Sequence, residues 1–225
     1  AWEGGGGGSS YTDPIGVTSF THTGGFQSGN GEIIITSSSQ AAALNFDGTG
    51  DNVNFGSAIS SSLQLTNKLT VEAWVKPTST VGVAMISGNH GTAGTGNSQY
   101  FFRKNTNQFQ IVINNGSTLS GPSAGTVVAN TWQHVAGVWD GAIVSLYVNG
   151  VLTGTAVQTG SFPISAKDIH TGSNGFNEHF GGDIDELRIW NRALCQGEIQ
   201  NNMNSELSLP QIGLISYHKF NQGIA

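Results

Sequence analysis

Three carboxylates stand close together late in the chain, in the stretch F-G-G-D-I-D-E-L-R-I-W-N-R-A-L that begins at Phe180. The stretch alternates as a β-strand does, and alternation puts Asp183 and Asp185 on one face, about 6.5–7 Å apart along the backbone. Carboxylates separated by roughly 5–9.5 Å serve as the acid and the nucleophile or base of glycoside hydrolases. Glu186, one residue further, would point to the other face.

The residues that continue this strand argue against catalysis. On strict alternation, Leu187 and Ile189 follow on the face of Asp183 and Asp185. A hydrolase needs an open polar groove beside its carboxylates, whereas aliphatic neighbours are typical of a packed core. We therefore predict a core strand without catalytic residues, and we do not expect the chain to be an enzyme.

A second acidic feature is the turn D-G-T-G-D-N, which spans residues 47–52. Ca²⁺ takes about six to eight oxygen ligands from carboxylates, backbone carbonyls and water. Asp47 and Asp51 supply carboxylates, and the glycines let carbonyl oxygens turn inward. The spacing is not that of an EF-hand loop. The alternative is that Asp47 only caps its own turn.

Two polar loops, residues 87–99 and 171–180, are candidates for a ligand site. Amide and acidic groups bind sugar hydroxyls, and the C–H patches of a sugar ring pack on an aromatic face. The candidate ligand residues are Asn89, His90, Asn174, Phe176, Asn177, Glu178 and His179. The alternative is that both segments are ordinary polar loops, in which asparagine and glycine fill the turns.

Composition limits the classes of partner. Of 225 residues only 10% are charged and 33 are glycine, whereas roughly 25% of an average soluble domain is charged. The net charge of −6 and the lack of a Lys/Arg cluster exclude nucleic acid as a partner. No apolar run is long enough for a membrane span. The single Cys195 excludes an intrachain disulfide and a cysteine-rich zinc site.

Alternating segments predict antiparallel strands. Residues 69–77 alternate strictly. Residues 131–156 form three alternating runs joined at Asp140-Gly141 and Asn149-Gly150, dipeptides that are typical of hairpin turns. The tryptophans at positions 74, 132 and 139 lie within such runs, and we expect them in the core rather than on a sugar-binding surface.

These strands set the predicted fold and domain limits. The fold is all-β, a two-sheet antiparallel β-sandwich (jelly roll) with one short C-terminal helix, for which residues 195–207 are the candidate. Residues 39–209 would form this domain. Residues 1–38, rich in glycine and serine with a possible strand at 32–37, would be the tail of a preceding module or an ordered linker.

Four blocks of the sequence together resemble the bacterial laminin-G-like domains of the concanavalin A-like lectin/glucanase superfamily, to which pentraxins are related. The blocks are A-L-N-F-D-G-T-G-D-N-V, L-T-V-E-A-W-V-K-P, W-Q-H-V-A-G-V-W-D-G-A-I-V-S-L-Y-V-N-G and G-G-D-I-D-E-L-R-I-W-N-R-A-L-C-Q-G-E-I. Each is weak by itself, but the four follow in the family's order over residues 41–207. The resemblance implies a jelly roll, secretion or surface display, and binding of carbohydrate or protein.

The resemblance also bears on the acidic residues. In relatives, calcium commonly joins an early turn to an acid on the last core strand. The structural Ca²⁺ site implied here would use Asp47, Asp51, Asp183 and Asp185. Glucanases of the superfamily carry E-x-D-x-x-E on one strand, and Arg188 stands where the third acid should be.

The C-terminal residues 210–225 depart from the family's order. The family often places a strand of the type G-L-x-x-Y-x-F ahead of the early turn, whereas here the match, residues 213–223, follows the helix. This segment either opens the next module or docks on this domain's sheet, and we favour docking.

Together these features predict a non-catalytic adhesion or carbohydrate-binding module of an exported, multi-domain bacterial surface protein. Its partners would be a polysaccharide or cell-surface glycan, or a protein, together with neighbouring modules of the same chain. Its location would be secreted or at the bacterial cell surface. The alternative is a structural spacer that presents other domains, and a polysaccharide hydrolase or lyase ranks third.

Overall fold

The chain divides into two compact units, Ala1–Ser38 and Ser39–Ala225. The computed structural model describes residues 43–57, 63, 65, 67–89 and 98–221, all within the second unit. The strand expected at 32–37 lies outside these residues. No helix among the residues described is long and apolar enough to cross a membrane.

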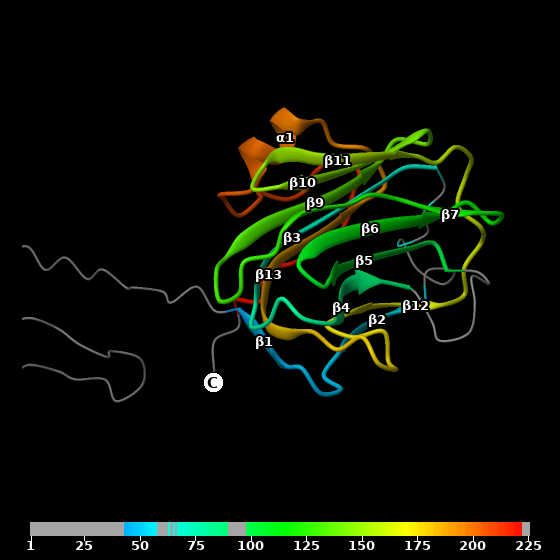
Figure 1. Cartoon of the computed structure of the whole chain (residues 1–225). Coiled ribbons are helices and arrows are strands. Elements are labelled where there is room, and N and C mark those ends of the chain that lie inside the picture. Colours follow the sequence, from blue (N-terminus) through cyan, green and yellow to red (C-terminus); the bar gives the residue numbers. More distant parts are fainter. Residues whose placement is uncertain (1–42, 58–62, 64, 66, 90–97, 222–225) are drawn as a thin grey trace, which may run out of the picture. The chain divides into compact units, whose positions relative to one another are not determined.

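The described residues of the second unit form two antiparallel sheets of seven strands each (Figure 1). Sheet A runs β1 (Leu44–Asp47), β13 (Gly181–Trp190), β3 (Leu69–Pro77), β9 (Gln133–Trp139), β10 (Ile143–Val148) and β11 (Val151–Val157), and β14 (Leu214–His218) pairs with β13. Sheet B runs β2 (Val53–Ser57), β12 (Asp168–Thr171), β4 (Val83–Gly88), β5 (Tyr100–Asn105), β6 (Gln108–Asn114) and β7 (Leu119–Ser120), and β8 (Ser123–Thr126) pairs with β6. The predicted jelly-roll sandwich is confirmed.

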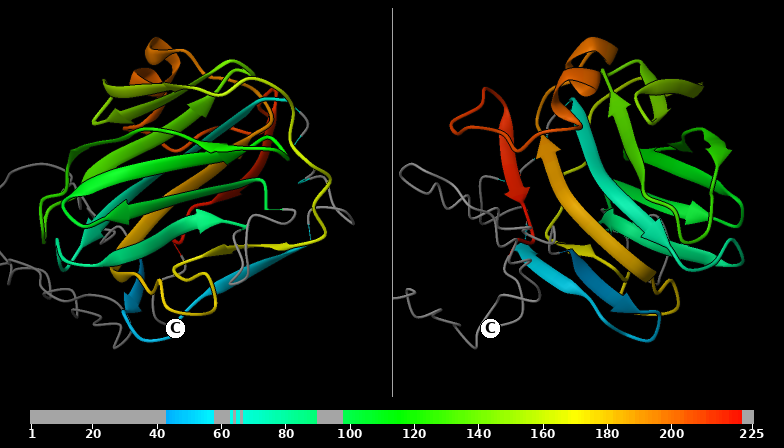
Figure 2. Two further views of the ribbon diagram at one scale, coloured as in Figure 1. Left: turned by 45° about the vertical axis from the view of Figure 1, so that its right-hand side comes forward. Right: turned by 90° about the vertical axis from the view of Figure 1, so that its left-hand side faces the viewer.

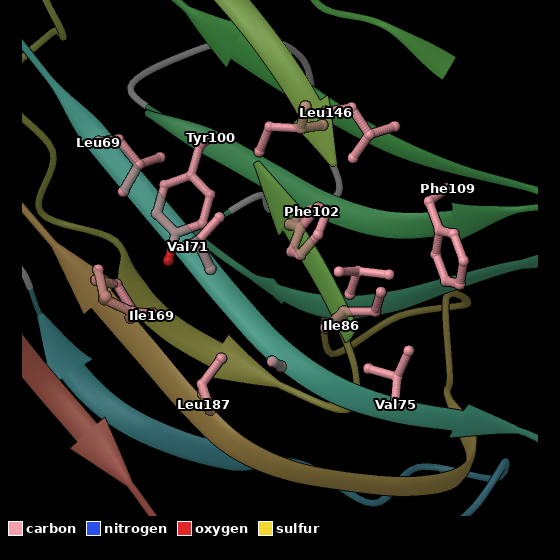
Figure 3. Close-up of a cluster of buried hydrophobic side chains, with 14 of the residues drawn as sticks. Leu69, Val71, Val75, Ile86, Tyr100, Phe102, Phe109, Leu146, Ile169 and Leu187 are labelled. Carbon is pink, nitrogen blue, oxygen red and sulfur yellow. The ribbon is translucent and has the colours of Figure 1, made fainter. Parts of the chain in front are cut away.

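The main core fills the space between the sheets. The alternation of β3 turns Leu69, Val71, Ala73 and Val75 inward, and all four are fully buried. They meet aromatic and aliphatic side chains of sheet B, among them Phe102 of β5 (Figure 3). The residues of β3 that alternate with these four point away from the main core, toward the outer face of sheet A.

The meander from β9 to β11 follows its predicted turns. Asn149 and Gly150 have φ angles of 50° and 72°, which a two-residue hairpin turn requires at both central positions. The β9–β10 turn is one residue longer, and the Asp140 carboxylate accepts hydrogen bonds from the backbone N–H of Ala142 and Ile143 at 2.8 and 2.7 Å.

Strand β13 contains a bulge that interrupts the alternation expected from the sequence. Its register with β3 shifts between Asp185 and Arg188, and Glu186 has a φ of 51°. The extra residue exchanges the two faces of the strand, so Leu187 packs in the main core while Asp185 and Glu186 both face outward. The prediction that aliphatic residues continue the face of the aspartates was wrong.

One short helix, α1 (Gln196–Asn202), covers part of the outer face of sheet A. Its Ile199 packs on Trp190 of β13 and Ala136 of β9 in a second, smaller core. The helix ends before the predicted limit of 207, because the following turn is held by Arg188, which donates to the carbonyls of Asn202 and Ser205 at 2.8 and 2.7 Å.

The C-terminal strand β14 pairs with the second half of β13, from Leu187 opposite His218 to Trp190 opposite Leu214. Strand β1 pairs with the first half of the same edge. Figure 2 shows β14, in red, beside β13. The segment after Asn202 therefore crosses the outer face of sheet A before it returns as a strand of that sheet.

Candidate functional site

Two of the predicted ligand residues hold their own loops. Asn89 is 1% exposed, and its Oδ1 accepts from the backbone N–H of Gln99 and Tyr100 at 2.7 and 3.2 Å. Asn174 is 7% exposed, and its Oδ1 accepts from the backbone N–H of residues 176–178. These amides replace missing backbone partners in turns, which is a structural role.

Glu178 and His179 also bond within the protein. Glu178 accepts a 2.5 Å charge-assisted hydrogen bond from Arg103. His179 lies 2.9 Å from the Ser173 hydroxyl through Nδ1 and 3.2 Å from the Phe176 carbonyl through Nε2. Both ring nitrogens of His179 are thus engaged, and the second carboxylate oxygen of Glu178 is buried.

The described parts of the two loops adjoin where Ser87 of β4 pairs with Thr171 of β12. Asn89 bonds to Ser165, ahead of the start of β12, whereas the loop that carries Phe176 and Asn177 leaves the end of that strand. Phe176 and Asn177 are exposed, and Phe176 keeps 52% of its surface. His90 lies outside the described residues. The predicted set therefore leaves two exposed candidates on one loop.

The acidic turn is organised by its own hydrogen bonds. Asp47 Oδ1 accepts from the backbone N–H and the hydroxyl of Thr49 at 2.6 and 2.8 Å, and Asp51 Oδ2 accepts from the backbone N–H of Asp47 at 3.0 Å. The Thr49 N–H holds the pKa of Asp47 below its usual value. Asp47 thus caps the turn, as the alternative interpretation expected.

The two aspartates of β13 have different partners and different neighbouring strands. Asp183 accepts from the Asn45 amide at 2.6 Å and pairs with Lys76 at 3.3 Å. It is a diagonal neighbour of Asp47 across β1, but Asp185 is two residues further along and opposite Trp74 of β3. Over the part of the chain that the structure describes, no three His, Cys, Asp or Glu side chains group as a metal site would.

A pocket of about 400 Å³ opens on the outer face of sheet A beside α1. It joins residues that are far apart in sequence, from β3, from the start of β9, from the β13 bulge and from both sides of β14. Its lining consists of Trp74, Trp132, Asp185, Glu186, Met203, Asn204, Ser205, Glu206 and Asn221. Aromatic, amide and carboxylate groups, the set expected on the polar loops, are combined here instead.

The two tryptophans of the pocket were wrongly predicted as core. Trp132 precedes the first residue of β9 and keeps 38% of its surface exposed, with the Lys76 ammonium 6.0 Å from its ring centroid. Trp74 faces outward from β3, and its Nε1 donates to the Met203 carbonyl at 2.6 Å. Only Trp139 is fully buried between the sheets, as expected.

Beneath the pocket lies a buried polar network. Glu72, fully buried, accepts from Trp190 Nε1 at 3.1 Å and lies 3.7 Å from the guanidinium of Arg188, which is 1% exposed. Burial raises the pKa of Glu72, and Arg188 opposes that rise. Burial lowers the pKa of the neighbouring His134 to about 3, so its imidazole is neutral at neutral pH.

Each basic side chain around the pocket pairs with at least one carboxylate, and Arg188 lies near two, Glu72 and Glu186. Lys76 pairs with Asp183 at 3.3 Å. Arg188 donates to Glu186 at 2.5 Å, and Lys219 donates to Glu206 at 2.7 Å. Asp185 has no such partner in the described chain.

The carboxylate of Asp185 therefore lines the pocket together with Trp74 and Trp132 and has no basic partner among the described residues. Its Oδ1 accepts from the backbone N–H of Glu186 at 2.8 Å, which the bulge directs toward it. Burial, followed by the negative charges of Glu186 and Glu206, raises the pKa of Asp185 to about 6. Half-buried acids with a shifted pKa are common in the pockets of functional sites.

The sequence carries only a partial signal for this pocket. Alternation places Glu72, Trp74 and Lys76 on one face of the strand at residues 69–77, and that face is the one that carries the pocket. The contributions of Glu206 and Asn221 depend on how the chain returns after α1, which no local pattern specifies.

Comparison with known proteins supports the fold. Residues 47–200 match the family model described as the concanavalin A-like lectin/glucanases superfamily. Pappalysin-1 of Mus musculus is 29% identical over 137 residues, which cover 56% of this chain and 8% of that protein. This chain therefore spans a small part of that relative's length.

Two solved structures share the sandwich at low sequence identity. A candidate carbohydrate-binding protein from Bacteroides ovatus ATCC 8483 superposes with a TM-score of 0.61 at 19% identity, over 81% of this chain and 52% of that one. The carbohydrate-binding module CBM40 of the Ruminococcus gnavus IT-sialidase, bound to α2,3-sialyllactose, has a TM-score of 0.53 at 20% identity, over 71% and 97% of the two chains. At these identities the likeness concerns the fold alone.

Proposed function

The chain belongs to the concanavalin A-like lectin/glucanases superfamily, and on that premise we propose that it is a non-catalytic carbohydrate-binding module for a polysaccharide or a cell-surface glycan. One observation carries the proposal, the pocket that combines the exposed ring of Trp132 with the carboxylates and amides of Asp185, Asn204 and Asn221. An aromatic face for sugar C–H groups and polar groups for hydroxyls are what a shallow sugar site needs.

The same pocket argues for binding rather than hydrolysis. Glycoside hydrolysis generally uses two carboxylates, one as acid and one as nucleophile or base. Here Glu186 is fixed by Arg188 and by the Tyr217 hydroxyl, and Glu206 is fixed by Lys219. Asp185 is left as the single acid of the pocket lining without a basic partner among the described residues, so a binding role is the simpler use of the site.

Replacing Trp132 with alanine is expected to weaken glycan binding at least tenfold, because tryptophan side chains supply a disproportionate share of binding energy at such contacts. Tenfold corresponds to about 1.4 kcal/mol. A high-density array of polysaccharides, followed by calorimetry on the hits, measures this effect. Reducing-end release from the same polysaccharides, measured in parallel, is expected to be nil.

Phe176→Ala is the matched control, because Phe176 is an exposed aromatic residue on the polar loop of residues 171–180. This variant is expected to bind as the unaltered chain does. If Phe176→Ala abolishes binding and Trp132→Ala does not, the site lies on the loop instead. If the unaltered chain binds no glycan at all, the module is a structural spacer.

For the acidic turn we propose a structural calcium ion held by Asp47 and Asp51. The hydrogen bonds within the turn use one oxygen of each carboxylate. Because Ca²⁺ would bind only the folded turn, saturating calcium is expected to raise the Tm by about 5 °C or more relative to EDTA, and Asp51→Asn should remove the shift. Equal melting temperatures in EDTA and millimolar calcium would end this proposal.

The proposed context is an exported, multi-domain surface protein of a bacterium, in which the module acts in adhesion alongside neighbouring modules and protein partners. The low charge content and polar, turn-rich composition support this context. Several weak sugar sites that act together would raise the overall affinity without any new contact.

A further inference from the structure

The electrostatics of the pocket on sheet A indicate which sugars it can take. Lys76, Arg188 and Lys219 are each committed to a carboxylate within 3.3 Å. Among the described residues, Asp185 accepts only from the Glu186 backbone N–H, on Oδ1. The pocket lining therefore includes a carboxylate, that of Asp185, which pairs with no basic side chain among the described residues.

The aromatic side chains around Asp185 favour the same kind of partner. The face of an indole ring attracts a cation and is the best of the aromatic side chains in this respect. Trp132 and Trp74 line the pocket together with Asp185, and Lys76 already occupies such a position 6.0 Å from the Trp132 centroid. A ligand with a positive group would find a carboxylate and aromatic rings in one cavity.

Neutral and acidic ligands fit less well. A neutral sugar that covers the pocket would desolvate the Asp185 carboxylate without neutralising it, which costs free energy. A uronic or sialic acid would bring a carboxylate close to Asp185, Glu186 and Glu206, all of which line the pocket. The second case is the less favourable, because like charges repel strongly where water is partly excluded.

Resting on the carbohydrate-binding function proposed above, we propose that this pocket selects a sugar unit with a free amine, an amino sugar within a polysaccharide, and that Asp185 is the residue that binds the ammonium group. The ammonium donates hydrogen bonds to the carboxylate, and charge-assisted bonds of this kind are roughly twice as strong as neutral ones. The ring of the sugar packs on Trp132, and the amide of Asn204 and the amide oxygen of Asn221 are available to its hydroxyls, while the Asn221 NH2 donates to Glu206.

Calorimetry with four defined oligosaccharides of equal length tests the selectivity. The probes are oligomers of glucosamine, of N-acetylglucosamine, of glucose and of galacturonic acid. The glucosamine oligomer is expected to bind at least tenfold more tightly than the glucose oligomer, and the galacturonic acid oligomer should bind weakest. Acetylation removes the charge, so the N-acetylglucosamine oligomer should lose the advantage.

Asp185→Asn is expected to remove the preference for the amine while retaining the affinity for neutral oligomers. The amide oxygen of the new side chain can still accept the Glu186 N–H, and no charge is left to desolvate, so the variant should fold with an unchanged or higher Tm. Asp183→Asn is the matched control, since it makes the same change two residues away on the same face, outside the pocket lining. This control should keep the preference.

The outcomes separate the inference from the function on which it rests. Equal binding of the glucosamine and glucose oligomers, unaffected by Asp185→Asn, overturns the amine selectivity and leaves a sugar-binding module. Binding of no oligosaccharide at all overturns both. If a lysine-rich peptide competes through Asp185 as strongly as the glucosamine oligomer, the cation comes from a protein, and selectivity for an amino sugar is likewise overturned.

Discussion

Replacing Arg188 with methionine is expected to lower the free energy of unfolding by about 3–5 kcal/mol, the usual cost of removing one member of a buried ion pair. Methionine keeps much of the volume of the side chain but none of its hydrogen bonds. It would leave the Glu72 carboxylate buried without a cation, and it would leave the carbonyls of Asn202 and Ser205 without donors. Urea denaturation at neutral pH measures the loss.

The pH dependence of this loss identifies its cause. Burial raises the pKa of Glu72, and Arg188 opposes the rise. Without Arg188 the pKa of Glu72 in the folded state rises further, so the stability that the variant lacks at neutral pH returns as the pH falls and Glu72 takes up a proton. A loss that is the same at pH 7 and pH 5 would show that Glu72 is not responsible.

Arg192→Met provides the control for Arg188→Met. Arg192 pairs with Glu198 at 2.7 Å near the N-terminal end of α1, but both side chains are about a third exposed. An exposed pair of this kind contributes about 0–1 kcal/mol. If Arg192→Met costs as much as Arg188→Met, burial is not what makes the Arg188 network important.

The strands were predictable from sequence because their faces are set by local alternation. Strand β3 was predicted over residues 69–77 and forms over those same residues, and its alternation puts Leu69, Val71, Ala73 and Val75 in the main core. The turn at Asn149-Gly150 was predictable for the same reason, because its φ angles are a local requirement. Short strands such as β7 and β8 carry too few residues for any pattern.

The bulge at Glu186 is where local reasoning failed. A positive φ at a glutamate is uncommon, and neither hydropathy nor turn residues signal it. The bulge nevertheless decides which side chains of the strand reach the pocket, because it turns Glu186 outward beside Asp185 and returns Leu187 to the core. Bulges are frequent next to functional sites, where they redirect side chains.

The candidate site was unpredictable for a different reason. Its lining comes from β3, from the start of β9, from the β13 bulge and from the segments that flank β14. Asn89 and Asn174 were predicted as ligand residues, but each completes backbone hydrogen bonds of its own loop. Amide side chains in loops often do this rather than bind ligands. The residue types were the right ones for a sugar site, but their positions depended on long-range pairing.

Gly182→Ala is expected to be the second severe change, with a loss of about 3 kcal/mol or more. Gly182 has a φ of 133°, a conformation that L residues rarely adopt, and such strain costs about 1–3 kcal/mol. An added Cβ would also lie 2.2 Å from the Lys76 carbonyl oxygen. That atom belongs to the backbone of β3, so the ladder between β13 and β3 must shift, at a further cost of about 1–3 kcal/mol.

Gly181→Ala is the neighbouring control. Gly181 has no positive φ, and its added Cβ would lie 3.0 Å from the Thr78 hydroxyl oxygen, a side-chain atom that can move. We expect this variant to lose about 1 kcal/mol or less, since only a side chain must adjust. Urea denaturation of the two variants side by side distinguishes them. Equal stabilities would mean that β13 and β3 do not approach as closely at Gly182 as the structure places them, and the position of Asp183 and Asp185 on the outer face would then need revision.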